Sequence, residues 1–93
     1  MRTIETTTQF KKDFKRELKG RFKTTITNDL PAALNMLVAD KKLPAKYKDH
    51  SLTGEWKDCR DCHIRPDLVL IYSKPDDERL VLLRIGSHSE LQI

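Results

Sequence analysis

A chain of 93 residues is long enough for one domain, residues 1–93, and too short for two. Its 38% hydrophobic and 34% charged residues are the composition of a folded globular protein rather than of a disordered one. No apolar run approaches the roughly 20 residues that a membrane-spanning helix needs, and the first residues lack the apolar stretch of a signal peptide. We therefore expect a cytoplasmic domain with no membrane partner.

The first part of the chain predicts a short strand and a helical hairpin. Residues 4–8 are β-branched and few, as in an edge strand. Apolar residues then recur every four positions, as on the buried side of a helix: Phe10, Phe14, Leu18 and Phe22. Gly20 is expected to end this helix. A second helix is expected to begin at Thr27 or Asp29, which would place Pro31 in its first turn.

The rest of the chain predicts strands. Residues 41–55 have no clear period, and a stretch of this kind in a small domain is usually functional. Residues 56–63 alternate, residues 68–72 and 80–85 are apolar runs, and short turns join the three. We expect an α+β fold: an N-terminal strand, a helical hairpin, and a three-stranded antiparallel meander that completes a four-stranded sheet, with both helices on one face.

All three histidines lie outside the expected helices. His50 is in the long loop, His63 at a strand end, and His88 just after the last strand. Histidine titrates near neutral pH and suits general acid–base catalysis. Asp67 can orient an imidazole, and Arg84 can stabilise charge on a phosphate. The alternative is that one histidine is an ordinary hydrogen-bonded strand residue and the other two are merely exposed.

The segment Cys59–His63 reads C-R-D-C-H, the pattern of c-type haem attachment, and it could also supply half of a zinc site. Two features argue against both interpretations, because nothing directs export and no second cysteine pair is present. In a strand, moreover, Cys59 and Cys62 are an odd number of residues apart and point to opposite faces. We therefore predict two free thiols, no metal and no cofactor.

The basic residues gather in two stretches, residues 11–23 and 41–48, and the chain carries a formal net charge of +4. Such surfaces suit RNA, because each contact between a cationic side chain and a phosphate releases condensed counterions. An acidic protein is a second class of partner that fits the same surface.

Two elements resemble the signature of YafQ-type toxins in the RelE/ParE superfamily. The first consists of Tyr47-Lys48-Asp49-His50, Leu52, Gly54, Trp56-Lys57, Arg60 to Asp67, and Leu70-Ile71-Tyr72. The second, residues 84–91, reads R-I-G-S-H-S-E-L and resembles the family's R-x-G-x-H-x-x-L element. The close resemblance covers about residues 44–91. The chain departs from it at Leu68 and at residues 91–93, where family members often carry aromatic residues.

This resemblance implies a RelE-like fold and the toxin of a type II toxin–antitoxin pair, an endoribonuclease that cuts mRNA in the ribosomal A site. By motif, the catalytic set would be His50, His63, Asp67 and His88. Further residues would contact the substrate: Arg84, Asp61, Lys48 and Lys57. A cognate antitoxin, acidic and folding on binding, would hold the toxin inactive.

These residues support a metal-free mechanism in which a base activates the ribose 2′-hydroxyl and an acid protonates the leaving 5′-oxygen. The products would be a 2′,3′-cyclic phosphate and a 5′-hydroxyl. We expect His88 as the acid, His50 or His63 as the base, and Asp67 to orient or balance charge. The alternative function is a non-catalytic module that binds RNA or an acidic protein.

Overall fold

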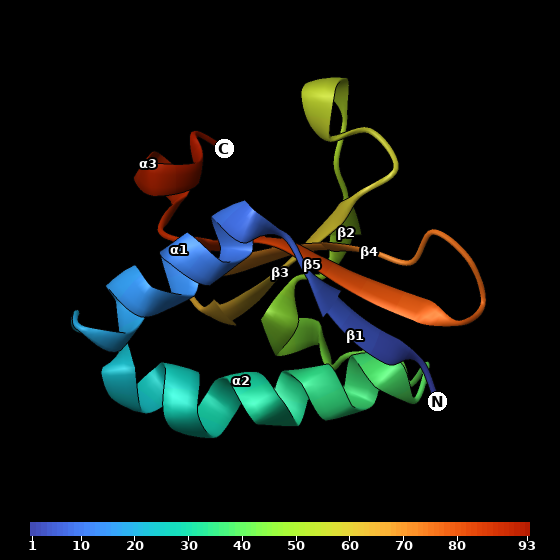
Figure 1. Cartoon of the computed structure of the whole chain (residues 1–93), viewed down its shortest axis with the longest axis horizontal. Helices are drawn as coiled ribbons and strands as arrows, with labels where there is room; N and C mark the ends of the chain where they lie inside the picture. The colour runs from blue at the N-terminus through green and yellow to red at the C-terminus, as the bar shows by residue number, and fades with distance from the viewer.

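A five-stranded mixed sheet forms the centre of the molecule, in the order β1-β5-β4-β3-β2 (Figure 1). The computed structural model describes residues 1–93. The strands are β1 (Thr3–Thr6), β2 (His50–Ser51), β3 (Arg60–Arg65), β4 (Leu68–Ser73) and β5 (Arg79–Gly86). Only β1 and β5 are parallel to each other, and the remaining pairs are antiparallel. The α+β prediction and the meander are confirmed, but the expected four-stranded sheet is wrong.

The fifth strand comes from the segment expected to be an irregular loop. His50 and Ser51 pair with Asp61 and Arg60, so that a two-residue strand extends the sheet beyond β3. Two 3-10 turns flank it, η1 (Ala45–Tyr47) and η2 (Gly54–Trp56). The strand predicted to begin at residue 56 therefore begins later, at Arg60.

Two helices cover one face of the sheet, α1 (Thr8–Leu18) and α2 (Lys23–Val38) (Figure 1). The Thr7 hydroxyl accepts a hydrogen bond from the backbone nitrogen of Phe10 at 3.0 Å and caps the start of α1. Pro31 was expected in the first turn of α2, and this prediction is wrong, because the helix begins at Lys23. Neither helix, nor the short α3 (His88–Leu91), is long and apolar enough to cross a membrane.

The helix α2 continues through Pro31 because its buried side chains hold it against the sheet. Pro31 has no backbone N–H, so one hydrogen bond of the helix is lost at that point. Leu30 and Ala33, on either side of it, are 3% and 0% exposed in the main core. Tertiary packing of this kind outweighs local helix propensity.

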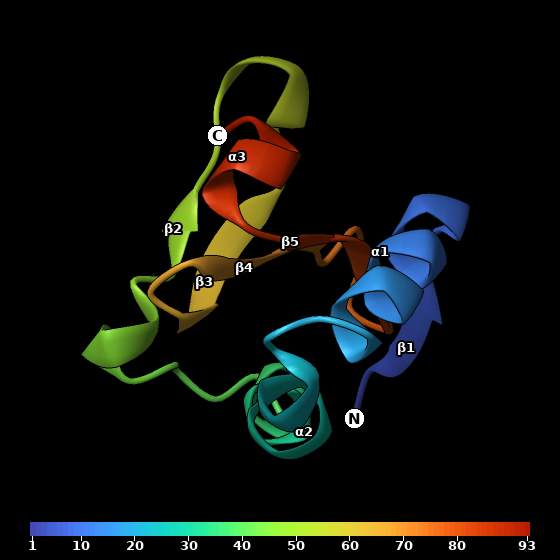
Figure 2. The same cartoon turned by 90° about the vertical axis from the view of Figure 1, so that its left-hand side faces the viewer.

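The central strand β4 is buried on both faces, as its continuous apolar run predicts. Leu68, Leu70 and Tyr72 belong to the 16-residue core beneath the helices. Val69 and Ile71 point to the opposite face, where they pack against Leu91 of α3. Figure 2 shows α2 and α3 on opposite sides of the strands. This second face carries the histidines.

Candidate active site

The three histidines meet on the face of the sheet that α3 partly covers. The ring centroids of His63 and His88 are 5.0 Å apart, and those of His50 and His63 are 6.5 Å apart. The topology brings them together, because Val69 of β4 pairs with His63 on one side and with Gly86 on the other. The segment after Gly86 turns into α3 and places His88 beside His63.

Asp67 fixes the orientation of His88. Its Oδ1 accepts hydrogen bonds from the backbone nitrogen of His88 at 3.1 Å and from the ring Nδ1 at 2.8 Å. These hydrogen bonds hold the pKa of Asp67 below its usual value. Since a carboxylate accepts from Nδ1, that nitrogen carries the proton and Nε2 is left for another partner. Arg21 pairs with the second oxygen of Asp67 at 3.0 Å.

His50 is oriented by the backbone of Lys48. Its Nδ1 lies 2.7 Å from the carbonyl oxygen of Lys48 and 2.9 Å from Oδ1 of Asp61. One N–H serves the carbonyl, and Asp61 Oδ1 is left as a buried oxygen without a hydrogen-bond partner. Lys48 adopts the left-handed conformation, with φ 49° and ψ 40°. This conformation is uncommon outside glycine, and it costs about 1–2 kcal/mol.

Asp61 and His63 shift each other's titration. Burial raises the pKa of Asp61, which is 3% exposed, although the nearby histidines oppose the shift. Burial also lowers the pKa of His63; the charge of Asp61 opposes this shift, while His88 and His50 add to it. The lowered pKa favours the neutral form of His63, which can accept a proton.

A cleft of about 630 Å³ opens beside His63 and His88. Its other walls come from α2, η1 and the end of β3: Asp29, Ala32, Lys46, Tyr47, Lys48, Ile64, Arg65 and Pro66. Lys46 and Lys48 are exposed at the cleft, whereas Arg65 pairs with Asp29 at 2.7 Å. The cleft therefore offers cationic groups next to the imidazoles, which suits a phosphodiester.

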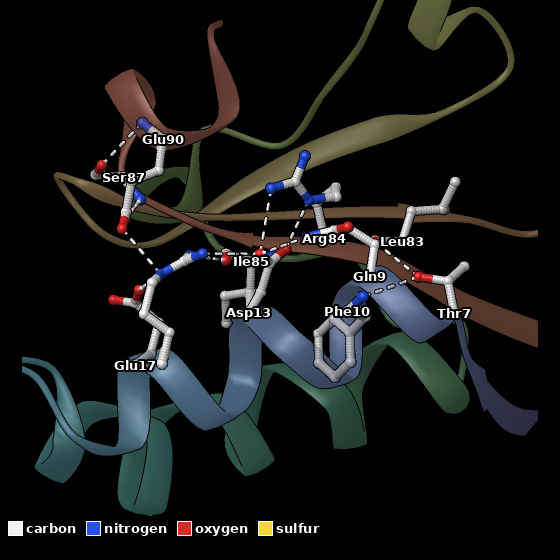
Figure 3. Close-up of polar contacts among 11 residues, drawn as sticks. Thr7, Gln9, Phe10, Asp13, Glu17, Leu83, Arg84, Ile85, Ser87 and Glu90 are labelled. Carbon is white, nitrogen blue, oxygen red and sulfur yellow. Dashed lines mark hydrogen bonds and ion pairs between the residues drawn. The ribbon is translucent and has the colours of Figure 1, made fainter.

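The structure places two of the expected substrate contacts away from this cleft. Arg84 donates to Asp13 through Nε at 2.6 Å and through Nη2 at 3.2 Å (Figure 3). It lines a smaller hollow that Trp56 and Glu90 also border. Lys57 is exposed directly after η2, outside the residues that line the cleft. Lys48 and Asp61 are the two substrate candidates that lie with the histidines.

The two departures from the family pattern have different surroundings. Leu68 is 0% exposed and belongs to the main core, so its side chain does not reach the cleft. Gln92 is exposed and has a left-handed backbone conformation at the end of α3.

Sequence reasoning missed Asp13, which is 0% exposed. Burial alone would raise its pKa, but hydrogen bonds from Arg84, Ile85, Gln9 and Arg16 outweigh burial and lower it. A signal was present, because Asp13 lies three residues after Phe10 on the buried side of α1. A carboxylate at such a position needs a buried cationic partner.

The two cysteines are free and lie on opposite faces, as predicted. Cys62 is 0% exposed in the main core. Cys59 packs on the second face, against the cluster formed by Val69, Ile71 and Leu91. No group of three or more histidine, cysteine, aspartate or glutamate side chains is arranged to hold a metal ion.

A family model described as the bacterial toxin of type II toxin–antitoxin systems, YafQ, matches residues 2–93. The chain belongs to the YafQ toxin family. An mRNA interferase toxin YafQ from Escherichia coli (strain K12) is 43% identical over 91 residues, which are 97% of this chain and 95% of the relative. The resemblance stated from residues 44–91 is thus confirmed, and it extends along nearly the whole chain.

Solved structures of the family share the fold. The toxin of the E. coli DinJ–YafQ complex has a TM-score of 0.83 at 39% identity, covering 98% of both chains. A copper-bound mutant toxin from Helicobacter pylori has a TM-score of 0.84 at 39% identity, covering 98% of this chain and 99% of the relative. The predicted RelE-like fold is confirmed by these similarities.

Proposed function

We propose that this member of the YafQ family is an mRNA interferase, a metal-independent endoribonuclease that cuts mRNA in the ribosomal A site. The observation that carries the proposal is the hydrogen-bonded pair of His88 and Asp67, with the ring of His63 5.0 Å from that of His88. The Asp67 carboxylate holds one imidazole in place, and the second imidazole lies directly beside it. Two positioned imidazoles can serve as the acid and the base of one reaction.

In the proposed reaction, a histidine takes the proton of the ribose 2′-hydroxyl, and the oxygen attacks the adjacent phosphorus. The bond from phosphorus to the 5′-oxygen breaks, and His88 gives its proton to that oxygen. The products are a 2′,3′-cyclic phosphate and a 5′-hydroxyl. The base gains one proton from the 2′-hydroxyl and His88 loses one to the 5′-oxygen, so the net number of protons on the protein is unchanged. Each positioned acid or base contributes roughly 10²–10⁴-fold to the rate.

Two histidines can serve as the base. His50 has its Nδ1 committed to the Lys48 carbonyl, which leaves Nε2 with a free lone pair. His63 lies beside His88, with 5.0 Å between the ring centroids, and burial lowers its pKa. Because Asp61 and His63 each affect the pKa of the other, the pH dependence of cleavage belongs to the pair if His63 is the base.

The mRNA strand is proposed to lie in the cleft between α2, η1 and the histidines. Lys46 and Lys48 would contact the phosphates on either side of the bond that is cut. We place Lys57 on the path of the strand beyond the cleft. Arg84 is a weaker candidate for phosphate binding, because its charge is already compensated by Asp13.

We also propose an acidic cognate antitoxin that folds onto the basic side of α1. A family member from E. coli has been solved in complex with DinJ, which supports an antitoxin as the partner of this chain. In this chain, Lys12 and Lys15 are exposed on α1, and Lys19 is exposed directly after its last residue. These lysines complement an acidic segment and would steer its association.

A reconstituted translation reaction tests the proposal. Purified ribosomes translate a defined mRNA with the wild-type protein, with His88→Ala or with Asp67→Asn, and cleavage is followed by primer extension. Asp77→Asn, in the turn between β4 and β5, is the matched control for the loss of a carboxylate. We expect cleavage by the wild type and the control, and loss of at least roughly 10²-fold with His88→Ala. Tight RNA binding without cleavage by the wild type would favour the non-catalytic module instead.

A further inference from the structure

The side chain of Arg16 joins three elements of the fold. Within α1 it pairs with Asp13 at 2.9 Å and with Glu17 at 2.8 Å. Its Nη2 donates to the carbonyl oxygen of Ile85 on β5 at 3.0 Å. Its Nε lies 2.8 Å from a carboxylate oxygen of Glu90 on α3. A single guanidinium therefore links the first helix to the corner between β5 and α3.

Gly86 lies at this corner, and its lack of a side chain leaves room for Arg16. A Cβ atom built on Gly86 would lie 2.7 Å from Nη2 of Arg16, closer than real Cβ contacts allow. Gly86 is not among the residues with positive φ, so its backbone conformation does not call for glycine. The Cβ would also lie 3.3 Å from Oε1 of Glu90 and 3.4 Å from a methyl carbon of Leu91, so a side chain at this position would disturb the contacts between Arg16 and α3.

Glu90 transmits this contact to the start of α3. One of its oxygens accepts from the backbone nitrogen of Ser87 at 2.9 Å, and the Ser87 hydroxyl accepts from the backbone nitrogen of Glu90 at 3.1 Å (Figure 3). Together these bonds form a capping box. A helix of four residues has little stability of its own, so α3 depends on this box together with the packing of Leu91 against the sheet. His88 is the residue that follows Ser87 directly.

We propose that Arg16 is a positioning residue for His88. It holds Glu90 in the capping box and the β5 carbonyl in place, so that His88 keeps its two hydrogen bonds to Asp67. A Cβ atom at position 86 would displace the end of the Arg16 side chain from this place, so Gly86 lets the guanidinium lie against the corner. The inference rests on the proposed function, in which His88 is the acid.

The test compares Arg16→Ala, Arg16→Lys, Gly86→Ala and the double variant Arg16→Ala/Gly86→Ala. Lys11→Ala, on the exposed side of α1, is the matched control for the loss of a positive charge. Hydrogen exchange of the His88 backbone N–H, measured by NMR, reports its bond to Asp67 whether or not RNA is cut. The kcat and KM for RNA cleavage and the Tm are measured on the same proteins.

We expect Arg16→Ala to speed exchange of the His88 N–H at least about tenfold and to lower kcat at least about tenfold. A tenfold change in either rate corresponds to about 1.4 kcal/mol. KM should change less than about twofold. Arg16→Lys should recover part of both losses, because its ammonium can still reach a carboxylate. Gly86→Ala should have the same effects as Arg16→Ala. The double variant should differ little from Arg16→Ala in exchange rate and kcat, because the effects of two mutations that remove the same contact do not add.

Two results would overturn the inference. If Arg16→Ala lowers Tm but leaves the His88 exchange rate and kcat as in Lys11→Ala, Arg16 is only structural. If Gly86→Ala lowers kcat and speeds His88 exchange as much in the Arg16→Ala background as in the wild type, the glycine does not serve to make room for Arg16. A wild-type protein that cuts no RNA would contradict the proposed function alone, because the exchange measurement still tests the positioning.

Discussion

One carboxylate oxygen of Asp67 accepts hydrogen bonds from both the backbone nitrogen and the ring Nδ1 of His88. Asp67 lies in the turn between β3 and β4, and His88 opens α3, so this oxygen ties two distant segments together at the histidines. Two donors on one oxygen fix both the ring orientation and its tautomer. The position of the proposed acid is thereby set by two elements at once.

The first prediction concerns this pair in living cells. Expression of the wild-type protein alone should halt bacterial growth by stopping translation, and His88→Ala should relieve the arrest, because loss of one acid–base group slows cleavage by roughly 10²-fold or more. Asp67→Asn should relieve it in part, since an amide oxygen is a weaker acceptor for the two hydrogen bonds that hold His88. Growth curves and protein synthesis after induction measure this. A His88→Ala protein that stays fully toxic at equal expression would mean that His88 does no chemistry.

The second prediction concerns the buried carboxylate of Asp61. Its charge raises the pKa of His63 against the effect of burial, so Asp61→Asn should lower the pKa of His63 further. If His63 is the base, it stays unprotonated to lower pH, and the acid limb of the pH–rate profile moves down. NMR titration of the His63 ring measures the pKa, with Asp77→Asn as the control. An unchanged or raised pKa would contradict the electrostatic account.

The same substitution has a stability consequence with a definite sign. Burial raises the pKa of Asp61 in the folded protein above its value in the unfolded chain, so the folded state disfavours its ionisation. Stability is therefore lost as pH rises from the unfolded pKa, near 3.9, through the raised one. Asp61→Asn should raise the free energy of unfolding at neutral pH relative to pH 4, as urea denaturation at the two pH values can measure. Equal effects of the substitution at both pH values would contradict this.

The site was predictable from the sequence where the motif and the topology agree. His63 and His88 were expected at strand ends that a meander brings together, and Val69 joins those ends as the expected order requires. His50 was placed in a loop, yet it lies in a short strand paired with Asp61. Two residues are too few to give a period, so sequence patterns cannot predict such a strand.

Partners from distant segments were not predictable. Arg84 looked like a free cation at a strand end, but Asp13 of α1 binds it, and nothing local in the sequence links the two. The start of α2 was misplaced for a similar reason. Burial of side chains such as Leu30 holds the helix together across Pro31, and local capping signals do not contain that information.

The third prediction concerns metal and the two cysteines. Burial raises the pKa of Cys59, as does Asp58, and burial raises the pKa of Cys62 to about 12. Both thiols keep their protons at neutral pH, and because they lie on opposite faces of the sheet they do not converge on one metal ion. Cys59→Ser combined with Cys62→Ala should leave RNA cleavage nearly unchanged; alanine suits Cys62 because a buried hydroxyl would lack a partner.

A metal assay belongs with this prediction, because a related toxin from H. pylori was solved with copper bound. We expect cleavage of naked RNA to persist in EDTA and the purified protein to hold no stoichiometric metal. A metal that copurifies at one per chain, and whose removal abolishes cleavage, would contradict the metal-independent mechanism.

The fourth prediction separates the two proposed surfaces of the toxin. Reversing Lys12, Lys15 and Lys19 to Glu should weaken antitoxin capture and slow its association, since exposed charges mainly steer encounter. Cleavage of naked RNA should change little, because these lysines are not among the residues that line the cleft. Stopped-flow binding at several salt concentrations, with cleavage assays alongside, measures both. Loss of cleavage with intact capture would show that α1 binds RNA instead.

The most direct test of catalysis through the ribose 2′-hydroxyl removes that one oxygen atom from the substrate. An mRNA with a single 2′-deoxynucleotide immediately 5′ of the cleavage site is presented to the protein in the reconstituted translation reaction. We predict that this substitution abolishes cleavage at that site, and that the unmodified mRNA yields a 2′,3′-cyclic phosphate and a 5′-hydroxyl. Continued cleavage of the 2′-deoxy substrate, or products that carry a 5′-phosphate, would contradict acid–base catalysis through the 2′-oxygen.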